Sequence, residues 1–203
     1  MHYQVTEQEL HSAKTPHHIF NINVIITHLF FSMIVLEIGQ TFELLLIPLV
    51  SSAVIAMLYF KTQKKIKTES WFVASHWMLA WRRGRILLFS YGVAISMVLI
   101  YLLIDTIFPG GFSMNDFSTE GTKTNLGEII TIRFSAVVIF VAVLITFMQT
   151  GISVYDAGKG IQDPKIAKLL PRDENSNIEL GEGSDEVKHD GVKSMNESGN
   201  GQS

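Results

Sequence analysis

The chain has no cysteine, only 5 prolines among its 203 residues, and few charges for its length. The absence of cysteine excludes a disulfide-stapled domain and thiol chemistry, and the lack of any regular glycine spacing excludes a collagen-like chain. Charged residues make up 17% of the sequence and hydrophobic residues 47%, which excludes a wholly disordered protein.

Long apolar runs are what the sequence has in abundance. A helix needs about 20 apolar residues to cross the roughly 30 Å hydrocarbon core of a bilayer. Four runs meet that length: 19–38, 42–60, 86–107 and 129–154. Backbone groups in lipid must be paired within their own segment. The pattern therefore predicts an all-α integral membrane protein with four transmembrane helices, spanning 19–154.

The distribution of basic residues predicts the orientation of these helices. Seven of the sixteen Lys and Arg residues lie in the loop 61–85, whereas the outer link 108–128 holds only Lys123. Basic residues concentrate in cytoplasmic loops. We therefore expect a multi-pass protein of the bacterial inner (plasma) membrane with cytoplasmic N- and C-termini. Residues 1–18 do not resemble a cleaved signal peptide, so we expect the first span to be retained.

The loop 61–85 is rich in tryptophan and arginine. Its aromatic and basic side chains are Trp71, Trp77, Trp81, Arg82, Arg83 and Arg85. One helix over 71–107 would be about 55 Å long, so the pattern favours a separate helix lying in the cytoplasmic interface. Such a helix either anchors to lipid or forms a docking platform for a membrane-protein partner. The charges are too few to favour nucleic-acid binding.

The two ends of the chain differ from its middle. Residues 1–18 form a polar cytoplasmic segment, and residues 155–203 hold ten of the nineteen acids. The tail is expected to be mostly disordered after residue 171, because it has too little apolar surface to fold alone.

Polar residues within the predicted spans are the candidates for function. His28 lies near the middle of the first span, and Ser51, Ser52 and Ser96 fall at similar depth in the next two. An ionisable group at that depth is costly and suggests a relay or a solute site. The alternative is a neutral histidine that makes one hydrogen bond between helices.

Charges also converge at the outer ends of the predicted spans. Glu37, Glu43 and Asp105 lie at three of these ends, and Arg133 lies about one turn into the fourth span. Asp105 is the expected partner of Arg133. The cluster is either an outward-facing vestibule or an ion pair with solvated carboxylates.

No catalytic, metal or cofactor site is expected from the sequence. His17 and His18 are adjacent, so they point to different sides of a helix, and no third ligand has a suitable spacing. A bis-histidine haem site would need a partner for His28 on a facing helix.

Three functions remain open after these exclusions. The leading interpretation is a non-catalytic subunit or accessory protein of a larger membrane assembly, such as a secretion, conjugation, respiratory or transport complex. The alternative is an autonomous oligomeric transporter or channel protomer that uses the His28 layer and the outer carboxylates. A membrane haem protein is third.

Overall fold

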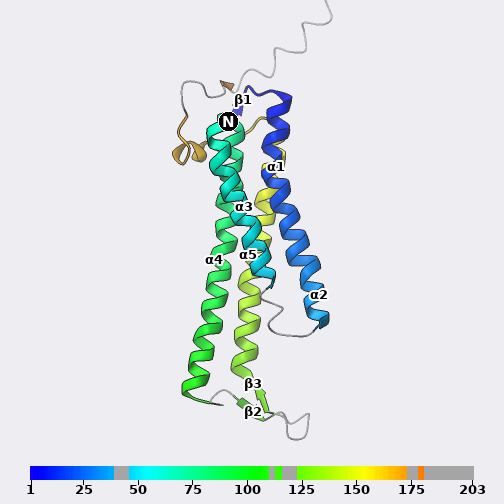
Figure 1. Cartoon of the computed structure of the whole chain (residues 1–203), viewed down its shortest axis with the longest axis vertical. Coiled ribbons are helices and arrows are strands. Elements are labelled where there is room, and N and C mark those ends of the chain that lie inside the picture. Colours follow the sequence, from blue (N-terminus) through cyan, green and yellow to red (C-terminus); the bar gives the residue numbers. More distant parts are fainter. Residues whose placement is uncertain (39–45, 110–112, 116–122, 173–177, 181–203) are drawn as a thin grey trace, which may run out of the picture.

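The computed structural model describes residues 1–38, 46–109, 113–115, 123–172 and 178–180. It is a bundle of long helices (Figure 1), four of which are long and apolar enough to cross a membrane. The all-α prediction with four membrane-length helices is confirmed at this level. Glu43 and most of the predicted disordered tail lie outside the described residues.

The first long helix is made of three segments that follow one another directly. They are α1 (Glu7–Asn23), the π-helix η1 (Val24–Phe30) and α2 (Phe31–Ile38). A capping box begins it: the Thr6 hydroxyl accepts from the Glu9 N–H, and the Glu9 carboxylate accepts from the Thr6 N–H. The helix therefore begins well before the predicted first span, and it continues through Pro16.

The other three long helices are α3 (Leu46–Thr68), α4 (Trp71–Ile107) and α5 (Leu126–Gly158). The predicted interfacial helix is wrong, because α4 runs unbroken for 37 residues, and its first turns lie inside the bundle. Trp71 and Trp77 are buried there. The helix does not stop at the expected membrane boundary because its first ten residues are apolar enough to pack against α1 and α5.

One end of the bundle is covered by the N-terminal residues and by the segment that follows α5. Strand β1 (His2–Tyr3) pairs with β4 (Glu179–Leu180), and His2 also bridges to Ile161. The short 3₁₀-helix η3 (Pro164–Lys168) buries Ile166, and the Trp71 indole donates to the Leu170 carbonyl at 2.9 Å. We call this the capped end.

At the opposite end, α4 and α5 extend beyond α2 and α3 (Figure 1). Here strands β2 (Ser113–Asn115) and β3 (Lys123–Asn125) form a small antiparallel hairpin before α5. We call this the hairpin end. The two hydrophobic clusters of the core lie towards the capped end, around Phe20, Ile55 and Leu87 in one and around Tyr3, Phe72 and Ile166 in the other.

Candidate functional site

A chain of polar side chains crosses the middle of the bundle between the first helix, α3 and α4. The Thr27 hydroxyl donates to the Asn23 side-chain oxygen at 3.0 Å, and the Asn23 amide donates to the Ser51 hydroxyl at 2.9 Å. The Ser51 side chain also lies close to the Tyr91 hydroxyl. The Tyr91 hydroxyl is in turn 2.6 Å from Nε2 of His28. We call these five residues the polar chain.

The π-helix η1 positions two members of this chain. It carries Thr27 and His28 and follows directly after Asn23, the residue to which Thr27 donates. A π-turn adds one residue to the turn and is frequent at functional sites. Three side chains within six residues therefore reach the same network, and a regular α-helix would turn adjacent residues to different sides.

The predicted layer of polar residues is found only in part. His28 and Ser51 both belong to the polar chain. Ser96 does not, because its hydroxyl is exposed and donates to the Gly92 carbonyl of its own helix. Ser52 is half-buried and adjacent to Ser51, so the helix turns it away from the chain. Sequence reasoning missed Asn23, Thr27 and Tyr91. For Asn23 and Thr27 the available signal was their position five residues and one residue before His28. Tyr91 lies on a facing helix and had no such signal.

A second polar contact lies closer to the capped end. Nε2 of His17 is 3.0 Å from Nδ1 of His76, and neither side chain has any exposed surface. His17 is buried between α1 and α4, while the adjacent His18 is exposed, as the helical geometry predicts for neighbouring residues. A separation of 3.0 Å fits a hydrogen bond. It is too short for two nitrogens on opposite sides of a haem iron, which need about twice a metal–nitrogen bond of roughly 2 Å.

The surroundings of this histidine pair are polar but incompletely bonded. Nδ1 of His17, Nε2 of His76 and one terminal nitrogen of Arg83 are buried without a hydrogen-bond partner. Arg83 interacts electrostatically with Asp156 on α5. Close by, the Gln162 amide donates to the Ser75 hydroxyl. The pair therefore belongs to a polar layer beneath the capped end.

The tryptophan and arginine residues of α4 do not form one exposed platform. Trp81 is half-buried and its ring lies 4.8 Å from the ring of Tyr59. Arg82 and Arg85 are exposed, whereas Arg83 turns inward. Because Trp71 and Trp77 are core residues, the exposed part of the predicted docking surface consists of Arg82 and Arg85.

The predicted outer ion pair is not formed in the described part of the chain. Arg133 is exposed, Asp105 is half-buried, and the salt bridge found among the described residues joins Lys65 to Glu69. The Ser135 hydroxyl contacts the Ala94 carbonyl of α4. Arg133, two residues earlier, is turned by about 200° around α5. It therefore points away from α4 and from Asp105. Glu37 is exposed on α2.

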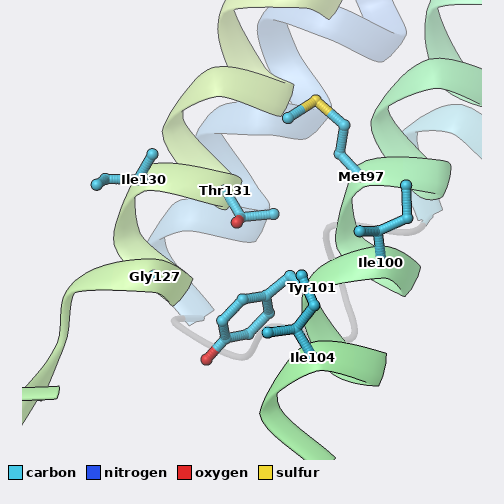
Figure 2. A pocket seen from close by; sticks show the side chains of 7 residues that line it. All are labelled: Met97, Ile100, Tyr101, Ile104, Gly127, Ile130 and Thr131. Carbon is cyan, nitrogen blue, oxygen red and sulfur yellow. The ribbon is translucent and has the colours of Figure 1, made fainter. Parts of the chain in front are cut away.

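An apolar groove of about 310 Å³ lies between α4 and α5 near the hairpin end (Figure 2). Beside it the Tyr101 hydroxyl accepts from the Asn125 side chain, which also caps α5 by accepting from the Glu128 N–H. The lining side chains are Met97, Ile100, Tyr101, Ile104, Ile130 and Thr131, with Gly127. The groove could bind an apolar group by shape and apolar contact, and its lining has no acidic or basic side chain that could act in catalysis.

Among the described residues no cluster of three or more histidine, aspartate or glutamate side chains could hold a metal ion. Comparison with known proteins finds no matching family model, curated protein or solved structure. The polar chain, the histidine pair and the exposed surfaces are therefore the features from which a function is argued.

Proposed function

We propose that the protein is a small multi-pass membrane protein that acts as a non-catalytic subunit or accessory protein of a larger membrane assembly. The observation that carries this proposal is the filled interior of the described bundle. The buried polar side chains in the middle of the bundle hydrogen-bond to one another. The groove between α4 and α5 opens on the outer surface of the bundle. A protein built this way works through its surface.

The described surface has one apolar band whose height fits the hydrocarbon core of a bilayer. Ile55 touches Gly84, so Phe60 and Lys61 of α3 lie near Leu79 of α4, and the Ser135–Ala94 contact places Arg133 near Met97. The helix between these levels is about 27 Å long, close to the hydrocarbon thickness of about 30 Å. The exposed side chains between them are mostly apolar, and Arg82 and Arg85, which are among the exceptions, lie towards the capped end of this span.

The basic residues of α3 and α4 support the orientation. Lys61, Lys64, Lys67, Arg82 and Arg85 are exposed on the side of the capped end. The positive-inside rule then places that end, with both termini, in the cytoplasm, and the hairpin end outside. A bacterial inner membrane suits this arrangement.

The test is mass spectrometry of what co-purifies with the tagged protein in mild detergent. Two exposed surfaces are changed separately: Arg82→Glu with Arg85→Glu, and Thr131→Leu in the groove. Ser96→Leu, on an exposed face of α4 outside the groove, is the control. We expect stoichiometric partners that one surface variant loses and the control keeps. A monomer or homo-oligomer that never retains a partner would show the subunit proposal to be wrong.

A second candidate function is an oligomeric transporter or channel protomer, and the polar chain is the observation that favours it. Polar groups in the middle of a membrane bundle are costly, and they commonly mark an ion or solute pathway. His28→Phe and Tyr91→Phe should then abolish flux in proteoliposomes while the protein stays folded. Ser96→Ala should leave flux unchanged. Flux that survives both substitutions would reject this candidate.

A further inference from the structure

The levels of the helices place His28 within the proposed bilayer, towards its outer side. Its contact Tyr91 lies twelve residues along α4 from Leu79 and about six residues from the level of Arg133. Among the described residues, the charged side chains nearest to it along the surrounding helices are Arg85, Asp105, Glu37 and Arg133. Along the helix axes, each of these charges is at least one and a half turns from the level of the His28–Tyr91 contact. No permanently charged side chain of the described residues therefore lies beside the ring.

The polar chain has a direction that ends at His28. Thr27 donates to Asn23, and the Asn23 amide donates to Ser51. Ser51 then has its own proton free to donate to Tyr91, and Tyr91 has its proton free to donate to Nε2 of His28. In this arrangement every oxygen of the chain is bonded. Nε2 carries a lone pair, so the neutral ring carries its proton on Nδ1.

The same chain accommodates the protonated ring by reversing two hydroxyl groups. When a proton binds Nε2, the new N–H donates to the Tyr91 oxygen, and the Tyr91 O–H turns to the Ser51 oxygen. Ser51 then donates to a carbonyl of its own helix, as serine commonly does in helices. The Asn23 and Thr27 bonds are unchanged. One proton is added, no group leaves, and no buried polar atom loses its partner.

We propose that His28 is a proton-binding site, and that Tyr91, Ser51, Asn23 and Thr27 are the hydrogen-bonded chain that accommodates both of its protonation states. His28 is only partly buried, and its ring contacts Tyr91 through Nε2. The contrast with His17 and His76 supports the assignment. Those rings are fully enclosed, and their outer nitrogens already lack partners. A proton site at His28 is a property beyond the subunit function, and for the second candidate function the proton would be the transported species.

The test reads the ring directly, by nitrogen NMR of ¹⁵N-histidine-labelled full-length protein in lipid nanodiscs. The His28 signals are assigned by their loss in His28→Gln. We expect a neutral ring protonated at Nδ1 at alkaline pH, and a gain of the Nε2 proton as the pH is lowered. A ring protonated at Nε2 at alkaline pH, or one that keeps a single state between pH 8 and pH 4, would overturn the proposal.

Tyr91→Phe separates a proton site from a merely structural histidine. It removes the hydroxyl while it keeps the ring that packs against His28. A hydrogen bond to a charged group is stronger than one to a neutral group by roughly 1.4 kcal/mol. The ratio of protonated to neutral His28 at a fixed acidic pH should therefore fall about tenfold. Ser96→Ala should leave it unchanged, and an unaltered His28 spectrum in Tyr91→Phe would also overturn the proposal.

If Tyr91→Phe fails to fold, Thr27→Val tests the far end of the same chain. It should weaken the directional preference and populate the other neutral ring form. Proton flux in proteoliposomes then distinguishes proton binding at His28 from proton transport by the protein. A ring that titrates without flux keeps the proton site and rejects transport. Flux that continues in protein whose His28 never titrates rejects the proton site alone.

Discussion

Between Trp71 and Ala94, helix α4 contributes fourteen buried residues, whereas between Ile95 and Ile107 it contributes none. Helix α5 repeats the contrast, because its buried residues begin only at Ser135. The capped half of the bundle is thus packed like a soluble core, with the covering segment 159–172 and strand β1 over it. The hairpin half is two helices with a groove between them. The fold is therefore held by the capped half, and the hairpin half depends on what surrounds it.

The largest difference between the halves should appear when a phenylalanine is shortened in each. Phe72 has no exposed surface, while Phe134 in the hairpin half is 53% exposed. Phe72→Ala should lower the free energy of unfolding by about 3–5 kcal/mol, since it removes buried contacts and leaves a cavity. Phe134→Ala should change it by no more than about 0.5 kcal/mol. SDS-induced unfolding in mixed micelles measures both, and equal losses would contradict the comparison.

The closeness of α3 and α4 gives the next largest effect. A Cβ added at Gly84 would lie 2.7 Å from Cγ2 of Ile55, whereas one added at Gly92 would meet nothing within 4 Å. Gly84→Ala should cost about 1–3 kcal/mol of unfolding free energy, because overpacking forces neighbouring side chains to move. Gly92→Ala on the same helix is the matched control and should be neutral or slightly stabilising. A tolerated Gly84→Ala would mean that the two helices are looser here than described.

Much of this architecture could be predicted from the apolar runs alone. Four runs of about 20 residues require four long helices, since a bilayer admits few other solutions. The capped half could not be predicted in the same way. The segment that contains Trp71 and Trp77 has the composition of an interfacial helix. These two residues belong to the core only because α1 and α5 pack against α4.

The polar sites show the same limit of sequence reasoning. His28 and Ser51 could be identified by depth, because a polar residue inside an apolar run stands out. Tyr91 could not, since nothing in the sequence aligns it with His28. The π-turn that brings Thr27 and His28 together is also unmarked in the sequence. His17 and His76 are separated by 59 residues, and their contact depends on the register of α1 against α4.

The histidine pair should give an effect of similar size that is specific to the capped half. Replacing either His17 or His76 by alanine leaves the other ring buried without its partner, which should cost about 1–3 kcal/mol. The double substitution should cost less than the sum of the two, by about 1 kcal/mol, because the shared hydrogen bond is then lost only once. His18→Ala, at the exposed neighbouring position, should have little effect. Additive single costs would argue against a bond between the two rings.

The smallest expected effect concerns the charges of the hairpin half. Arg133 points away from α4, so Asp105→Asn and Arg133→Gln should be independent within about 0.5 kcal/mol in a double-mutant cycle. The single substitutions should also cost little, because neither side chain has an ionic partner in the described chain. A coupling above about 1 kcal/mol would mean that the pair forms after all. The hairpin half would then be fixed by an internal contact and would depend less on the lipid or protein around it.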